Sequence, residues 1–263
     1  MRGALAIARK DLNVAFTTPL AWVAFVVVAF VAALSFNSYL GWYVTQAMQG
    51  AGLANATLGA HANPTELVVA PGLGALGVLL MLSSPLLTMR LVAEEKGRRT
   101  FELLMTAPIR PSAIVAGKFL AGLGLVVVLL AIGAVFPVAL AFMGRGQAAP
   151  VVEWQTVATC FAGLLLLGAM CQAIGLFLSA LTESMAVAAL LSFLVMLLLL
   201  LLPRAAVGAQ GPLRDTIAVL STPEHMASFL EGRLELKDVL YFLSVTALGL
   251  YLTDRAIEGH RWA

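Results

Sequence analysis

Long stretches of apolar residues dominate the chain. Hydrophobic side chains fill positions 120–140 and 190–202 with few interruptions, and no water-facing helix carries such stretches. A hydropathy scan predicts six membrane spans, most of them roughly 17–25 residues long. The spans must be helical, because lipid offers no hydrogen-bond partner to the backbone. They cover residues 20–40, 68–89, 119–143, 157–181, 186–202 and 239–253, the last being the shortest.

The basic residues give these spans an orientation. Eleven Lys and Arg residues lie in one set of connecting segments and five in the other. The positive-inside rule places the richer set in the cytoplasm, so both termini are predicted to be cytoplasmic. The segments 41–67 and 204–238 are then external, and their roles stay open. Within the second, residues 213–220 and 223–230 predict two short helices, with Pro223 suited to a first helical turn.

The first 18 residues predict an amphipathic helix that lies on the cytoplasmic face of the membrane. Leu5, Leu12 and Phe16 recur at helical spacing, with charged residues between them. A plain basic anchor that only sets the topology is the alternative. The apolar run that follows is longer than the core of a usual signal peptide, so we interpret it as a retained first span.

Composition supports a membrane protein. The chain is 61% hydrophobic and 11% charged, whereas soluble domains contain about a quarter charged residues. Its net charge of +2 does not suggest a nucleic-acid partner. Cys160 and Cys171 would lie about 16 Å apart on one helix, too far for a disulfide. Gly168, Gly175 and Ser179 allow close helix approach, more plausibly within the chain than between chains.

Few residues in the predicted spans offer chemistry. The spans contain no Asp, Glu, Lys, Arg or His, which disfavours an ion-driven secondary transporter. Gln172 is the most polar residue at mid-span, and an interhelical hydrogen bond explains it better than a substrate contact. The histidines, which occupy three different loops, form no metal-ligand set. They are His61, His225 and His260. No catalytic constellation is evident, so we do not expect an enzyme.

A nucleotide site is also missing from the sequence. The segment Ser112–Phe119 is the nearest to a P-loop, but it lacks the first glycine and the final Ser or Thr. It therefore offers neither the phosphate-binding turn nor a magnesium ligand. If this protein uses ATP, the nucleotide binds to another chain.

The loop at 90–118 is the densest polar segment. Its charges are of mixed sign, and Phe101, Leu103 and Leu104 form an apolar cluster among them. Thr100 could cap a short helix after Gly97, which Pro108 and Pro111 would stop. Such a helix suits docking into a groove on another protein. A solvated topogenic loop is the alternative, and the residues alone do not separate the two.

Several stretches resemble the type-2 ABC exporter permeases, most closely the gliding-motility-associated branch. The most specific is Leu86–Pro108, which contains Glu-Glu-Lys-Gly-Arg-Arg-Thr-Phe-Glu-Leu-Leu and is followed by Ile114–Phe119. Other similar stretches are Ile7–Leu12, Ala173–Ser184 and Asp238–Leu248. Together they extend over nearly the whole chain.

The resemblance implies a half-transporter in the bacterial inner membrane. It would pair with a second permease chain, as a homodimer or heterodimer, and with two ATPase subunits that bind ATP and magnesium. It leaves room for an accessory envelope subunit and implies no cofactor, metal or nucleic acid in this chain. The loop at 90–118 would hold the coupling helix, and Glu183 in the tight turn Thr182–Ser184 would also face the ATPase. The implied contact residues are Glu94, Glu95, Lys96, Arg98, Thr100, Glu102, Leu103, Leu104, Pro108 and Glu183.

The sequence thus predicts an all-α polytopic membrane protein with one permease domain over residues 1–263. Its expected function is to couple ATP hydrolysis in a separate subunit to export or extrusion. Two alternatives stay open. One is a complex that transmits ATPase work to envelope assembly or motility, and the other is a secondary transporter. The apolar spans do not identify a substrate.

Overall fold

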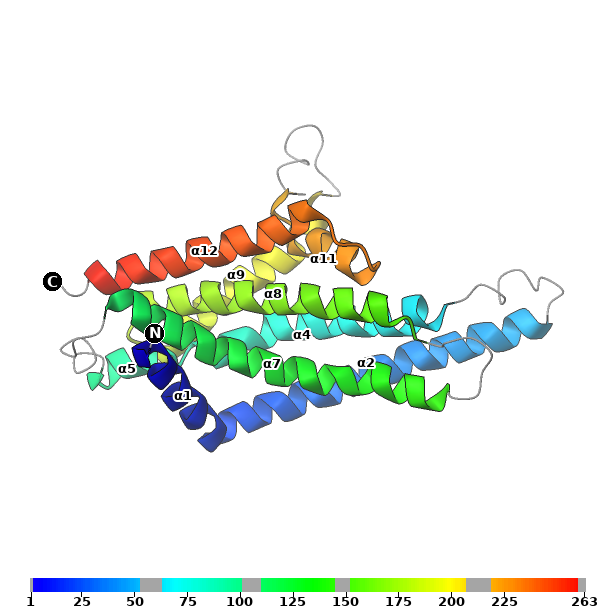
Figure 1. The fold of residues 1–263 in the computed structure, drawn as a ribbon, viewed down its shortest axis with the longest axis horizontal. Helices are drawn as coiled ribbons and strands as arrows, with labels where there is room; N and C mark the ends of the chain where they lie inside the picture. The colour runs from blue at the N-terminus through cyan, green and yellow to red at the C-terminus, as the bar shows by residue number, and fades with distance from the viewer. Residues whose placement is uncertain (1, 53–62, 101–109, 145–151, 207–218, 260–263) are drawn as a thin grey trace.

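The computed structural model describes residues 2–52, 63–100, 110–144, 152–206 and 219–259, and every regular element among them is helical. Six helical segments are long and apolar enough to cross a membrane, which confirms the predicted all-α, six-span fold. The elements are α1 (Arg2–Thr17), α2 (Pro19–Gly52), the π-helix η1 (Thr65–Val69), α4 (Ala70–Thr88), α5 (Ala93–Gly97), α7 (Pro111–Met143), α8 (Trp154–Leu181), α9 (Met185–Ala206), α11 (Thr222–Leu230) and α12 (Leu236–Gly259) (Figure 1).

The spanning helices are longer than the apolar windows that predicted them. α7 begins at Pro111, whose fixed φ suits the first helical position, well before the apolar run at 119. α2 continues to Gly52, so the first part of the predicted loop 41–67 is helical. With 34 residues, α2 is about 51 Å long and extends beyond its neighbours (Figure 1). These helices can continue past the apolar windows because polar side chains near their ends extend to water.

These longer helices carry ionisable side chains near their ends. Lys118 of α7 and Asp238 of α12 are both fully buried there. The predicted apolar spans contain no Asp, Glu, Lys, Arg or His, but the full helices, which extend beyond those spans, do. Asp238 has a partner, since its Oδ1 lies 2.7 Å from Nδ1 of His225 on α11, and the partners of Lys118 are described below.

α8 is the central helix of the bundle. In its most apolar window 61% of residues are buried, against 22% in α2 and 17% in α9. Close packing depends on its glycines, because a Cβ added at Gly168 would lie 2.4 Å from Val126 of α7. Likewise, a Cβ at Gly175 would lie 2.3 Å from Thr88 of α4. The small residues of α8 therefore serve packing within the chain, as the sequence favoured.

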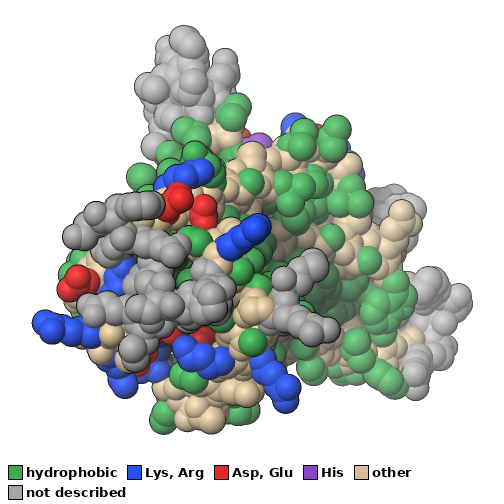
Figure 2. Space-filling view, turned by 60° about the vertical axis from the view of Figure 1, so that its left-hand side comes forward, with side chains coloured by type: hydrophobic (Ala, Val, Ile, Leu, Met, Phe, Trp, Pro, Cys, Tyr) green, Lys and Arg blue, Asp and Glu red, His purple; other side chains and the backbone are tan. Residues whose placement is uncertain are grey.

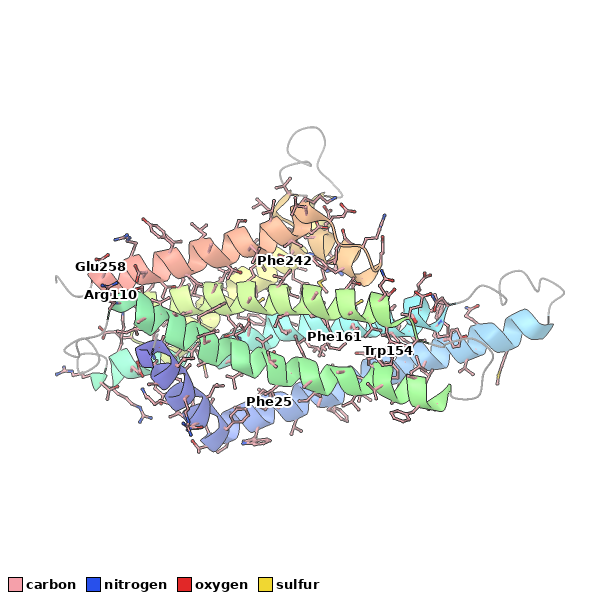
Figure 3. The ribbon with its side chains drawn as sticks, viewed as in Figure 1. Phe25, Arg110, Trp154, Phe161, Phe242 and Glu258 are labelled. Carbon is pink, nitrogen blue, oxygen red and sulfur yellow. The ribbon has the colours of Figure 1, made fainter. Side chains whose placement is uncertain are left out.

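α11 packs onto the central helix α8, near the end of the bundle that lies away from α1 and α5 (Figure 1). Phe229 is fully buried against Gly163 of α8. Phe242 of α12 is also buried, with its ring centroid 6.0 Å from that of Phe229 (Figure 3). Pro223 lies in the first turn of α11, as predicted. Most of the other helix expected in this segment, at 213–220, lies outside the described residues.

The opposite end of the bundle brings together α1, α5, the start of α7 and the last turns of α12 (Figure 1). We call it the basic end, because Lys and Arg side chains gather on it (Figure 2). Here α1 packs on α7, with Ile7 buried and Gly117 so close that an added Cβ would lie 2.7 Å from the Ala4 carbonyl oxygen. Leu5, expected on the apolar face, is 62% exposed. The docked face of α1 is thus set by α7.

Candidate functional site

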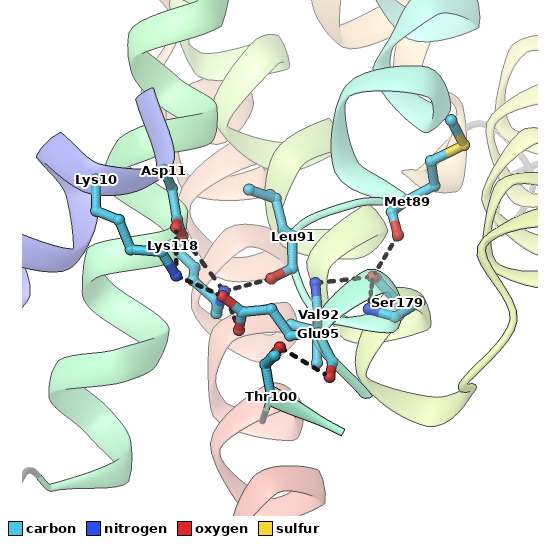
Figure 4. A network of polar contacts seen from close by, with 10 residues as sticks. Lys10, Asp11, Met89, Leu91, Val92, Glu95, Thr100, Lys118 and Ser179 are labelled. Carbon is cyan, nitrogen blue, oxygen red and sulfur yellow. Dashed lines mark hydrogen bonds and ion pairs between the residues drawn. The ribbon is translucent and has the colours of Figure 1, made fainter. Parts of the chain in front are cut away.

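The short helix α5 follows directly from the end of α4 and is held by a serine of the central helix. The Ser179 hydroxyl accepts hydrogen bonds from the backbone N–H groups of Val92 and Ala93, at 3.3 and 3.0 Å. It also donates to the Met89 carbonyl oxygen at 3.2 Å. Figure 4 shows these contacts. Because first-turn N–H groups lack helical partners, Ser179 supplies from α8 the cap that no local side chain provides.

Four charged side chains join α5 to α1 and α7 (Figure 4). Lys118 is only 1% exposed, and its Nζ lies 2.7 Å from Glu95 Oε2 and 3.3 Å from Asp11 Oδ2. It also donates to the Leu91 carbonyl oxygen. Lys10 Nζ closes the set, at 2.8 Å from Glu95 Oε1 and 3.4 Å from Asp11 Oδ1. We call Lys10, Asp11, Glu95 and Lys118 the ionic cluster.

The ionic cluster is electrically balanced, with two ammonium groups and two carboxylates. Balance matters because a buried charge without a partner costs several kcal/mol of desolvation. At the exposed edge, burial disfavours the charged form of Lys10. The hydrogen bond and charge of Glu95, with the charge of Asp11, outweigh burial and raise the pKa of Lys10 above its ordinary value. The neighbouring carboxylates therefore favour the charged form of Lys10 at the edge of the cluster.

The other side of α5 packs against the turn between α8 and α9. Lys96 is 8% exposed and donates to the Ala180 carbonyl oxygen at the end of α8. A Cβ added at Gly97 would lie 2.8 Å from the backbone oxygen of Glu183, so this contact requires glycine. The turn is tight, since α8 ends at Leu181 and α9 begins at Met185. α5 is thus fixed to this turn as well as to α1 and α7.

The outward face of α5 carries a second set of charges. Glu94 lies 3.0 Å from Arg98 and 3.6 Å from Arg90, and the Arg98 side chain is 71% exposed. The helix that Thr100 was predicted to cap would lie mostly outside the described residues, so that role stays a prediction. The Thr100 hydroxyl donates to the Glu95 carbonyl oxygen at 3.2 Å, and α5 is followed by Arg99 in the left-handed region at φ 57°.

The structure brings together the described members of the predicted contact set. Glu94, Arg98 and Thr100 face outward or border the surface, whereas Glu95 and Lys96 point inward to the ionic cluster and to α8. Four other members lie outside the described residues. They are Glu102, Leu103, Leu104 and Pro108.

Sequence reasoning assigned no site role to Lys10, Asp11 or Lys118, and it named Ser179 only as a small residue that allows close helix approach. A signal was available, because each lies within a family-like stretch: Ile7–Leu12, Ile114–Phe119 or Ala173–Ser184. Lys118 in particular directly precedes a long apolar run, where a lysine is expensive unless paired. Its partners, however, are distant in sequence, and only the packing of α1 and α5 on α7 reveals them.

Comparison with known proteins agrees with this architecture. A family model described as ABC-2 family transporter protein matches residues 5–262, nearly the whole chain. Comparison with curated protein sequences gave no match.

Proposed function

The chain belongs to the ABC-2 transporter family, and from this premise we propose that it is the permease of an ATP-driven export or extrusion complex in the bacterial inner membrane. The family implies a multi-pass membrane subunit that works with an ABC ATPase. Export as the direction of transport and the inner membrane as the location are our proposals. So is a complex of two permease chains and two ATPases.

ATP and magnesium would bind entirely to the partner. The P-loop-like segment Ser112–Phe119 lies in the first turns of α7, and its lysine, Lys118, is buried in the ionic cluster. A buried, fully paired ammonium has no capacity left for a phosphate. The contribution of this chain would be mechanical.

The observation that carries the proposal is the attachment of α5 to α1, α7, α8 and the turn that follows α8. The ionic cluster joins α5 to α1 and α7, Ser179 joins it to α8, and Gly97 packs on the α8–α9 turn. Movement imposed on this loop would therefore pass to several helices at once, which suits rigid-body rocking. Glu95 and Lys96 would hold the loop, while Glu94, Arg98, Thr100 and Glu183 border its outer surface.

The proposed orientation places the basic end in the cytoplasm. We expect a cysteine at Arg98 to react only with reagents that enter the cytoplasm, and one at Gly50 to react from outside, because eleven of sixteen basic residues would then be internal. Accessibility labelling in intact cells makes the measurement. The native Cys160 and Cys171 are both buried and provide an unlabelled background. External labelling at position 98 would overturn the orientation.

The response of ATP hydrolysis to cargo distinguishes transport from mechanical work on the envelope. In vesicles that contain the permease and its ATPase, we expect a transported cargo to stimulate ATP hydrolysis, since cargo binding would favour the conformation in which the ATPase closes. The rate of phosphate release with and without each candidate cargo gives the readout. Hydrolysis that no cargo changes, but an envelope partner does, would favour the gliding-motility-like alternative.

A further inference from the structure

A cavity of about 330 Å³ lies at the basic end, between α1, the end of α4, α5 and α7. This volume is at the small end of the range of about 300–1,000 Å³ for small-molecule sites. The ionic cluster forms part of its wall. The coupling role proposed above uses that wall but leaves the cavity itself without a function.

The side chains that line the cavity are polar beside α5 and apolar further along α4 and α7. On α7, Lys118 lines the polar half, and Leu125 lines the apolar half about 10 Å further along the helix. On the facing wall, Leu87 of α4 lies in the apolar half and Glu94 of α5 in the polar half. A ligand that fits both halves needs a polar head and an apolar tail.

The charges that line the cavity do not balance. Four basic side chains face three carboxylates, and the ionic cluster uses two of each. The remaining cations, Arg90 and Arg98, share the single carboxylate of Glu94. Nε of Arg90 is buried and has no hydrogen-bond partner among the described residues, and at 3.6 Å its ion pair with Glu94 is too long for a hydrogen bond. An anionic oxygen would complete this side of the cavity.

The edge of the apolar half is exposed. Val14 of α1 and Leu86 of α4 line the cavity and are 53% and 42% exposed. Nearby, the indole N–H of the exposed Trp22 donates to the Phe16 carbonyl oxygen at 2.7 Å. Tryptophan is enriched where the hydrocarbon meets the headgroups. These positions place the cavity at the membrane interface, with its apolar half open to acyl chains.

We propose that this cavity binds the headgroup of an anionic phospholipid. The phosphate lies against Arg90 and Arg98, and the first part of one acyl chain lies along Leu86 and Leu87, while the rest remains in the bilayer. A free phosphate would satisfy the arginines but leave the apolar half without a partner. A zwitterionic lipid would bring a second cation to a cavity that already has an excess of positive charge.

The test measures lipid bound to the full-length permease in nanodiscs of phosphatidylcholine that contain a minor share of phosphatidylglycerol. Native mass spectrometry of the released protein should show phosphatidylglycerol retained in preference to phosphatidylcholine. Arg90→Gln should weaken that retention about tenfold, because a hydrogen bond to a charged group is lost. Arg110→Gln is the control, since Arg110 is exposed at the same end and does not line the cavity (Figure 3).

A second variant tests the apolar half without changing any charge. Ala15 is half-buried in the cavity wall, so Ala15→Leu should fill the space and also lower retention. Ala131→Leu, on an exposed face of α7, should not. If Arg90→Gln does not fold, the comparison of Ala15→Leu with Ala131→Leu tests the proposal by itself. Unchanged retention in the Ala15 variant, equal retention of both lipids, or full displacement by inorganic phosphate would each overturn the proposal.

Discussion

Replacing Lys118 with methionine is expected to produce the largest loss of stability of any single substitution in the ionic cluster. The change leaves Asp11 and Glu95 facing only Lys10, so one buried carboxylate loses its partner. Breaking a buried pair from one side costs about 3–5 kcal/mol. The thermal midpoint of the purified permease should fall clearly, and ATP-driven activity should fall with it. Fluorescence-detected size exclusion after heating measures the first, and phosphate release the second.

Lys10→Met is the matched control. Its side chain is 57% exposed, and an exposed pair contributes about 0–1 kcal/mol, so this variant should keep nearly the wild-type midpoint. Adding Glu95→Gln to Lys118→Met restores the charge balance, and the double variant should recover part of the loss. If Lys118→Met unfolds at the same temperature as the wild type, the ionic cluster does not hold α1, α5 and α7 together.

Replacing Leu104 with aspartate is expected to separate the ATPase from an otherwise intact permease. Leu104 lies outside the described residues, and its role as an apolar anchor in a groove of the ATPase is a proposal. A charge in such a desolvated groove would cost several kcal/mol of docking energy. The permease should still insert, because its spanning helices are unchanged. Co-purification of the ATPase at matched permease levels measures the effect.

Charge reversal at Glu102 is the milder comparison in the same segment. A partly exposed ion pair at the rim of an interface contributes at most about 1 kcal/mol, so Glu102→Lys should retain most of the ATPase. Full transport and normal co-purification in Leu104→Asp would mean that the loop at 90–118 only sets topology, and that the ATPase binds elsewhere.

The fold was accessible from sequence because membrane insertion depends on long apolar runs. Hydropathy alone predicted six spans, and positions such as Gly168 and Gly175 indicated close packing within the chain. The helix ends were less accessible, since hydropathy does not register a helix that continues through polar residues. α7 begins at a proline that was interpreted only as a stop signal for the preceding segment, and this moves Lys118 from a loop into a helix.

The candidate site was only partly accessible for a different reason. The polar loop at 90–118 stood out by composition, but composition does not say which charges face inward. Glu95 and Lys96 are sequence neighbours of Glu94, yet Glu95 pairs with α1 and α7 and Lys96 with the end of α8. That division depends on the angular position of each residue on α5, which is fixed by Ser179 and Gly97 in tertiary contacts.

The ionic cluster also constrains the order in which the helices assemble during synthesis. Asp11 and Lys118 are 107 residues apart, and a ribosome that adds roughly 5–20 residues per second needs on the order of 5–20 s to make the chain between them. During that interval α1 has no α7 to dock on, and Asp11 lacks its partner Lys118. The ionic cluster can therefore form only after α7 has been made. A docked α1 requires that the first turns of α7, which carry Lys118, lie at the same end of the bundle as α1.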